Sequence, residues 1–242
     1  MNSKILLKKV LPRTMYVHLR SLSSQRKRTL SQLGQDFWVF GEAFNGMRRG
    51  FFVEVGSADG ILFSNTFLLE KRYGWTGICI EPDPLFFQDL RRVRSAKCLN
   101  VCVDAREGEV EFAQRDLFGG IVSEDTDNPR DVVERVKPGI LRLPARPLVS
   151  ILRSESAPQV IDYLSIDVEG AEERILCDFP FNEYLFRCMT VERPKARLRN
   201  VLDGNGYKAV KEIPHHDIFY VHESFYPEYE KNIFQFWGKY QT

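Results

Sequence analysis

The feature that most constrains the fold is a short apolar run that leads directly into a glycine turn, at residues 51–60. Four of its first five residues are large and apolar, which is typical of a central strand covered on both faces. Gly56 and Gly60 follow where the strand should end, and Ser-Asn-Thr at 64–66 can cap a helix that runs to about Arg72. A strand, a glycine turn and a helix N-terminus in this order predict the first crossover of a nucleotide-binding α/β sheet.

The spacing of these glycines separates one class of cofactor from another. The dinucleotide fingerprint G-x-G-x-x-G needs its middle glycine so that the backbone can approach a pyrophosphate, and Ala58 takes that position here. Glu54 lies two residues before Gly56, which gives the pattern E-x-G-x-x-x-G. This pattern suits a cofactor with an amino acid group and no pyrophosphate. The motif therefore favours S-adenosylmethionine over NAD, and it disfavours a nicotinamide oxidoreductase.

Acidic residues follow several of the later strand-like runs, at the point where each should end. Glu81, followed by Pro82, ends a predicted strand that begins at Thr76, where it could accept hydrogen bonds from ribose hydroxyls. Asp104 ends a predicted strand over 98–103 and could accept a hydrogen bond from an adenine amino group, although a turn-forming Asp explains it as well. Because the carboxyl ends of parallel strands meet at one edge of a sheet, these acids should share a rim with Gly56.

A second acidic cluster follows the predicted strand over 160–166. Asp167 ends this strand and Glu169 follows it, so both should reach the same rim. The alternative is that Glu169 and Glu172 only favour the N-terminus of the next helix. His215 and His216 separate two final predicted strands, 207–213 and 217–222, and a histidine at such a turn could face the cofactor. The pair lacks the partners of a zinc site, and no metal is predicted.

Two segments fall outside the regular pattern. Residues 1–35 contain no Asp or Glu but eight Lys and Arg residues, so they predict a basic extension before a single domain at 36–242. This extension could contact an anionic membrane surface or an acidic partner through residues 1–30, or it could be a solvated extension. Residues 114–147 are read as an irregular insertion over the site, where Asp125 or Arg130 could select the substrate.

The composition adds limits on location and partners. A formal net charge of +1 gives no global case for nucleic-acid binding, and no apolar stretch approaches the roughly 20 residues that span a bilayer. The five cysteines are an odd number without C-x-x-C spacing, which favours reduced thiols. We therefore expect a cytoplasmic protein that binds no nucleic acid.

Taken together, the motifs resemble the FkbM-type family of S-adenosylmethionine-dependent methyltransferases. The resemblance rests on Gly50–Gly60 with residues 64–66, then Glu70, residues 74–77, residues 80–84 and residues 162–172, in this order and spacing. It implies a Rossmann-like class I methyltransferase: an α/β fold with a mostly parallel, doubly wound sheet and a final antiparallel strand. The implied cofactor-binding residues are Glu54, Gly56, Ser57, Ala58, Asp59, Gly60, Asn65, Thr66, Glu81, Pro82, Asp104 and Asp167.

The resemblance also implies O-methylation of a hydroxyl, with sugars, glycan or glycolipid precursors and related small molecules as the usual acceptors. Such a reaction needs a base for the hydroxyl proton, for which Asp167 or Glu169 is the first candidate and His216 the second. A divalent metal bridging Asp167 and Glu169 to the acceptor is an alternative that we do not adopt. The alternative from another class of function is a non-catalytic adaptor that keeps the fold. Nucleic-acid methylation ranks third, because no Asn-Pro-Pro-aromatic or Pro-Cys motif is present.

Overall fold

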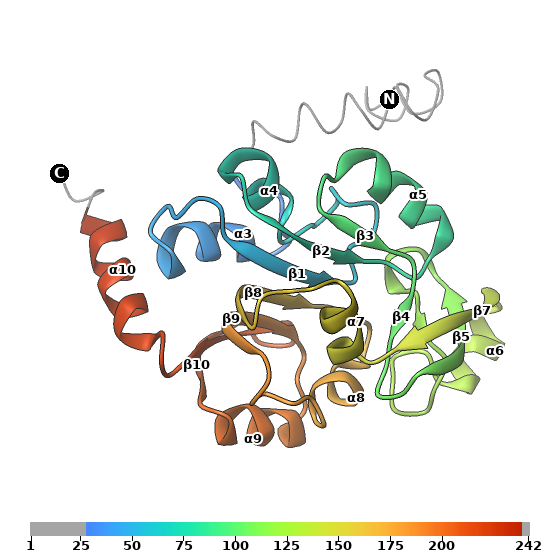
Figure 1. Cartoon of the computed structure of the whole chain (residues 1–242). Coiled ribbons are helices and arrows are strands. Elements are labelled where there is room, and N and C mark those ends of the chain that lie inside the picture. Colours follow the sequence, from blue (N-terminus) through green and yellow to red (C-terminus); the bar gives the residue numbers. More distant parts are fainter. Residues whose placement is uncertain (1–27, 239–242) are drawn as a thin grey trace.

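A computed structural model describes residues 28–238 of the chain, and its centre is a seven-stranded sheet (Figure 1). The strand order is β10-β11-β9-β8-β1-β2-β3. All neighbouring pairs are parallel except those made by β11, which runs antiparallel to both β9 and β10. This confirms the predicted Rossmann-like sheet with an antiparallel strand at the end of the chain. The strands are β1 Phe51–Val55, β2 Thr76–Ile80, β3 Lys97–Leu99, β8 Val160–Ile166, β9 Leu185–Glu192, β10 Tyr207–Glu212 and β11 Asp217–His222.

Helices cover both faces of this sheet because β1 alternates its buried side chains between two apolar layers. Val53 belongs to the layer beneath α7 Leu148–Ser154, α8 Glu172–Leu176 and α9 Ala196–Gly204. Phe52 belongs to the opposite layer, which also receives side chains from α4 Phe67–Tyr73, α5 Pro84–Val93 and α10 Tyr226–Gly238. Figure 1 shows α4 and α5 on one side of the sheet, and α8 and α9 on the other. Because β1 is buried on both faces, its sequence is the continuous apolar run from which the fold was predicted.

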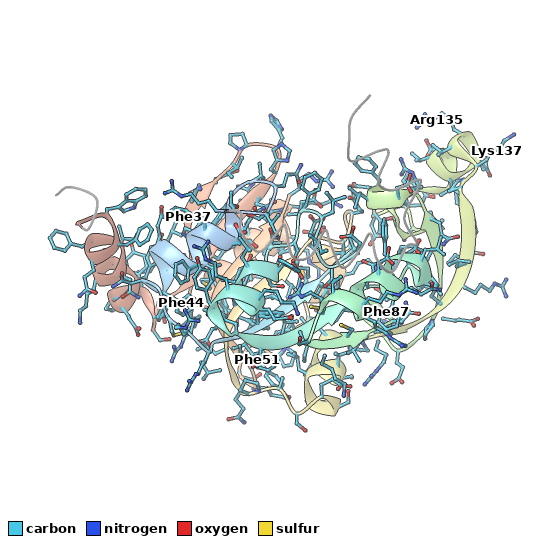
Figure 2. All side chains as sticks on the ribbon, turned by 90° about the horizontal axis from the view of Figure 1, so that it is seen from above. Phe37, Phe44, Phe51, Phe87, Arg135 and Lys137 are labelled. Carbon is cyan, nitrogen blue, oxygen red and sulfur yellow. The ribbon has the colours of Figure 1, made fainter. Side chains whose placement is uncertain are left out.

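The apolar pattern over residues 31–47 predicts a helix that packs over the sheet edge, with Gln35 and Asp36 at the cofactor pocket as the alternative. The structure has a shorter helical turn before β1. It consists of α3 Gln35–Phe37 and the π-helix η1 Trp38–Ala43. The Trp38 ring packs edge-on against Phe219 of β11, with 4.9 Å between ring centroids, so the segment covers a face of the sheet. Figure 2 labels Phe37, which lies within this segment, and Phe44, which follows it. Gln35 donates to Asp217, which places it in packing contacts and not at the cofactor site that was its alternative.

A second sheet of four strands lies beside the carboxyl edge of the first, and it corrects two predictions. Its order is β4-β7-β5-β6, with β4 Cys102–Val103, β5 Gly108–Gln114, β6 Gly120–Ile121 and β7 Gly139–Arg146. The strand predicted over 98–103 is in fact two, because the chain leaves the main sheet after β3 and joins the second sheet at β4. The predicted irregular insertion at 114–147 is largely regular, since it contains β6, β7 and α6 Arg130–Val136.

The longest strand of the second sheet, β7, was hard to predict because it buries little. Most residues of β7 are exposed or half-buried, and the strand is held by seven backbone pairs with β5. Arg135 and Lys137, at the end of α6, lie at the outer margin of the molecule in Figure 2. Within residues 28–238, no helix has the length and apolar character needed to cross a membrane. The predicted basic extension lies almost wholly outside the described residues.

Candidate active site

A cavity of about 540 Å³ lies at the carboxyl edge of the seven-stranded sheet. One wall comes from residues that follow the strands: Gly56 after β1, Glu81 after β2, Asp167 after β8 and Glu192 at the end of β9. The opposite wall comes from the second sheet, between Phe112 and Ile121. The rule that carboxyl ends of parallel strands share one edge thus brings most of the predicted site together.

Gly56 lets the chain turn out of β1 without blocking the neighbouring strand. Its φ is +85°, and a Cβ atom here would lie 1.9 Å from the backbone oxygen of Asp167. The two strand ends are joined further by the Asp167 N–H, which donates to Val55 at 3.1 Å. Gly60 also has a positive φ, but its missing side chain makes room for Leu90 on α5. Only the first of the two predicted glycines therefore lines the cavity.

Glu81 lies at the position predicted for ribose recognition. Its carboxylate lines the cavity and accepts the backbone N–H groups of Ala58 and Asp83, each at 2.8 Å. Each carboxylate oxygen keeps a further lone pair with which to accept a hydroxyl. Burial raises the pKa of Glu81 to about 8, and the nearby Asp83 and Asp59 add to this against the two backbone hydrogen bonds. Pro82 lines the cavity beside it.

Asn65 offers an acceptor that the rest of the described chain does not use. The residue is 7% exposed, and its side-chain amide donates to Ser165 at 2.8 Å. Among residues 28–238, its Oδ1 has no hydrogen-bond partner, although it lies at the cavity wall. A buried oxygen of this kind is costly unless a donor reaches it, and the ammonium group of a bound amino acid moiety is such a donor. The predicted cofactor therefore fits the donors and acceptors on this wall.

Glu54 lines the cavity but is committed to the protein's own network. Its carboxylate accepts from the hydroxyls of Ser64 and Thr66, from the Asn65 backbone, and from Arg94 at 3.1 Å. The sequence of the helix from Pro84 to about Arg94 predicts that Arg91, Arg92 and Arg94 form its solvated face. For Arg94 this prediction is wrong, because its side chain is fully buried. Its charge is what allows Glu54 to remain inside, because a buried carboxylate needs a partner.

Several predicted cofactor residues form hydrogen bonds within the glycine turn or pack beside it, and they do not line the cavity. The Ser57 hydroxyl donates to the Glu54 carbonyl, and the Asp59 carboxylate accepts the N–H groups of Ile61 and Leu62. Thr66 is fully buried against Arg94. These residues shape the loop that the cavity residues belong to.

The Asp104 carboxylate contacts α8 and not the cavity. It receives two hydrogen bonds from Arg174 of α8, both of 2.7 Å, and it does not line the cavity. The neighbouring Val101, Cys102 and Val103 line it instead. The proposed contact with an adenine amino group is therefore not supported by the position of Asp104. The split of the predicted third strand is the reason, because β4 turns Asp104 toward the second sheet.

The second acidic cluster is more compact than the sequence suggested. Carboxylate oxygens of Asp167, Glu169 and Glu192 lie within 4.8 Å of one another at the cavity wall. Burial, and then the neighbouring Glu192 carboxyl, raise the pKa of Asp167 well above its usual range. Burial and Glu192 likewise raise the pKa of Glu169 to about 8, against the opposing effect of Arg193. Carboxyl groups in a cavity whose pKa values are raised in this way are candidates for acid–base chemistry.

Glu192 and Arg193 are the two functional candidates that sequence reasoning missed. Arg193 donates to Glu192 at 2.9 Å and lies 3.4 Å from Glu169, so it balances part of the cluster's charge. Within the described chain, Oε2 of Glu192 is buried without a hydrogen-bond partner. The sequence did contain evidence for Glu192, because this acid stands at the end of a strand-like run, as Glu81 and Asp167 do.

His216 lines the cavity together with His215, as predicted, and its backbone oxygen accepts from Arg193 at 2.8 Å. Asp125 and Arg130, the predicted substrate selectors, do not line it. Asp125 pairs with Arg174 of α8 and Arg130 pairs with Glu111 of β5, so both are engaged away from the cavity. Arg115 and Asp127 take their place at the cavity wall.

With this geometry in view, comparisons with known proteins identify the class. The sequence profile of the methyltransferase FkbM domain matches residues 54–209, which is more than half of the chain. The chain therefore belongs to the methyltransferase FkbM domain family. It is an S-adenosylmethionine-dependent methyltransferase, and S-adenosylmethionine is its cofactor.

Among solved structures the similarities are distant. The methyltransferase domain of METTL16 matches with a TM-score of 0.42 and 13% identity, over 90% of this chain and 71% of that one. A human methyltransferase 10 domain containing protein gives a TM-score of 0.41 and 12% identity, over 90% and 92%. The fibrillarin pre-rRNA processing protein of Methanococcus jannaschii gives 0.41 and 12%, over 81% and 76%. No curated protein matches the sequence.

Proposed function

We propose that the protein transfers a methyl group to a hydroxyl of a sugar, of a glycan or glycolipid precursor, or of a related small molecule. The observation that carries this proposal is the cluster of Asp167, Glu169 and Glu192 in the same cavity as Glu81 and Asn65. Three carboxyl groups whose oxygens lie within 4.8 Å of one another can accept protons from the adjacent hydroxyls of a polyol. Of the two arginines that line the cavity, Arg193 is held in ion pairs and Arg115 donates to Asn128.

Different residues of the cavity bind different parts of the cofactor. Glu81 accepts ribose hydroxyls, the Oδ1 atom of Asn65 accepts an ammonium N–H, and the absence of a side chain at Gly56 keeps the turn open. When bound, S-adenosylmethionine supplies an electrophilic methyl group on a sulfonium centre. Holding the acceptor hydroxyl close to that group removes much of the entropic barrier to transfer.

The base is assigned to the Asp167–Glu169 pair, with His216 as the second choice. A hydroxyl loses its proton as the new carbon–oxygen bond forms, and a positioned base accelerates such a step by roughly 10²- to 10⁴-fold. The pKa of Glu169, raised to about 8, makes its ionised form a stronger proton acceptor than an ordinary carboxylate. Because these carboxyls interact, the ionisation belongs to the cluster and not to one residue.

The test is methyl transfer from isotope-labelled S-adenosylmethionine to a panel of sugars, oligosaccharides and glycolipids. We expect a methyl ether on one acceptor, detected by mass spectrometry and located by NMR. Glu169→Gln should reduce turnover by roughly 10²-fold or more while cofactor affinity stays within about threefold. Asp131→Asn, on the exposed side of α6, is the control and should retain wild-type turnover. A methyl group on nitrogen or carbon would overturn the proposal. Intact cofactor binding without transfer to any hydroxyl would favour the adaptor function.

A further inference from the structure

Three large apolar side chains are exposed where the cavity opens. Leu62, Phe63 and Phe118 all line the cavity, yet they are 37%, 47% and 63% exposed. Leu62 and Phe63 follow the glycine turn, and Phe118 belongs to the loop between β5 and β6, so the two main walls each contribute. We call these three residues the apolar rim. Single exposed apolar residues need no explanation, but a group of them at the entrance to a site indicates what enters or docks there.

The backbone holds part of this rim in an unfavourable conformation. Phe63 has a φ of +56°, in the left-handed region that bulky residues rarely adopt. Asp59 accepts the Leu62 N–H at 2.7 Å, and Phe63 pairs with Ser31 in an isolated bridge, so both sides of the loop are fixed. Such strain persists only where the surroundings enforce it, and it occurs preferentially at functional sites.

The apolar rim also adjoins the point where the basic N-terminal sequence reaches the described chain. Ser31 is the bridge partner of Phe63, and Gln32 lines the cavity. The described residues begin at Arg28, only three positions before Ser31. The 27 residues before it contain seven Lys and Arg and no Asp or Glu. A strongly cationic sequence is thus tethered beside an exposed apolar entrance.

We propose that the apolar rim docks on an anionic lipid bilayer and that the acceptor is an amphiphile presented from that surface. This inference rests on the proposed function, and it narrows the acceptor to a hydroxyl-bearing group carried by a membrane lipid. Each Lys or Arg near an anionic leaflet contributes about 1 kcal/mol, and aromatic side chains favour the bilayer interface. A basic segment and an apolar contact together provide the two weak signals that stable peripheral binding requires.

The test is co-sedimentation of the full chain with vesicles of phosphatidylcholine alone, and of phosphatidylcholine with about a third phosphatidylglycerol. We expect binding to the second kind only, weakened by salt. The double variant Phe63→Asn/Phe118→Ser should bind at least tenfold more weakly, and Asn is chosen because it tolerates a positive φ. The matched control is Phe234→Gln, since Phe234 is 82% exposed on α10 and does not line the cavity. It should bind as the wild type does.

A second variant tests the charge separately. Lys4→Gln/Lys8→Gln/Lys9→Gln should lower binding to the anionic vesicles by roughly 10²-fold, in line with three lost charges. Circular dichroism checks that each variant is folded. Equal binding to both vesicle types, no binding, or an equal loss in Phe234→Gln would each overturn the docking inference.

The outcomes also separate this inference from the proposed function. Methyl transfer to a soluble sugar without vesicle binding would leave the proposed function standing and remove the membrane-borne acceptor. Vesicle binding without transfer to any hydroxyl would leave the docking surface standing and would remove the proposed function together with the membrane-borne acceptor.

Discussion

Two acids with nearly the same sequence context have opposite roles at the scale of single residues. Glu81 and Asp104 each follow a strand-like run, and each was predicted to contact the cofactor. Glu81 accepts two backbone N–H groups and lines the cavity, whereas Asp104 accepts both hydrogen bonds from Arg174. The difference comes from the strand that precedes each acid: β2 stays in the main sheet, and β4 does not.

We therefore expect Glu81→Ala to weaken S-adenosylmethionine binding by roughly 10- to 100-fold, measured by calorimetric titration. The loss corresponds to two hydrogen bonds from the ribose hydroxyls. Asp104→Asn is the matched control, because it removes an ionic partner of Arg174 without touching the cavity, and its affinity should stay within about twofold of wild type. An equal effect of both variants would contradict the assignment of Glu81. A folded wild-type protein without measurable binding would contradict the whole site.

At the scale of elements, the end of α5 is joined to β1 and α4 by one buried cation. Arg94 donates to Glu70 at 2.8 Å and to Glu54 at 3.1 Å, with its side chain fully buried. These contacts raise the pKa of the guanidinium further, although burial opposes the shift. Burial raises the pKa of Glu70, but Arg94, Lys71 and the Ser95 backbone N–H together outweigh this effect, so the pKa is lowered. Arg94, at the end of α5, thus fixes the position of the glycine turn through its ion pairs with Glu54 and Glu70.

Replacing this cation should destabilise the fold strongly. We expect Arg94→Met to lower the free energy of unfolding by about 3–5 kcal/mol, because two carboxylates would remain buried without their partner. Arg92→Met, two positions earlier, removes an ion pair with Asp89 in which the Arg92 side chain is 39% exposed. It should lower the free energy of unfolding by no more than about 1 kcal/mol. Urea unfolding measures both. If Arg94→Met were as stable as Arg92→Met, the network would not be the anchor described here.

The same elements show what the sequence could and could not predict. The run into Gly56 was predictable because a strand buried on both faces is apolar throughout. Arg94 was not, because three nearby arginines look alike until α5 is placed against β1. β7 was missed because its apolar alternation, at Leu141, Leu143 and Ala145, is short and interrupted by Pro144, and its stability comes from backbone pairs with β5. Glu192 could have been found by applying the strand-end rule to β9 as it was applied to β8.

At the scale of the whole molecule, the acids around the cavity make stability depend on pH. Burial raises the pKa of Glu172 to about 7 and that of Glu81 to about 8, and Asp167 shifts in the same direction. In the unfolded chain these carboxyls lose their protons near pH 4 to 4.5. Between that range and about pH 8, the folded protein therefore holds more protons than the unfolded one. Stability should fall as pH rises through this window.

We expect the free energy of unfolding, from urea titrations without cofactor, to be lower at pH 8.5 than at pH 5.5 by a few kcal/mol. Glu172→Gln should reduce this difference, since glutamine keeps the oxygen that accepts from Val168 and Gly170 but cannot ionise. Glu134→Gln, on the exposed face of α6, controls for the loss of one negative charge and should leave the difference unchanged. A wild-type protein that is more stable at pH 8.5, or an unchanged difference in Glu172→Gln, would show that the buried acids ionise at no cost to the fold. The protein would then have to stabilise their charged forms through groups other than those described around the cavity.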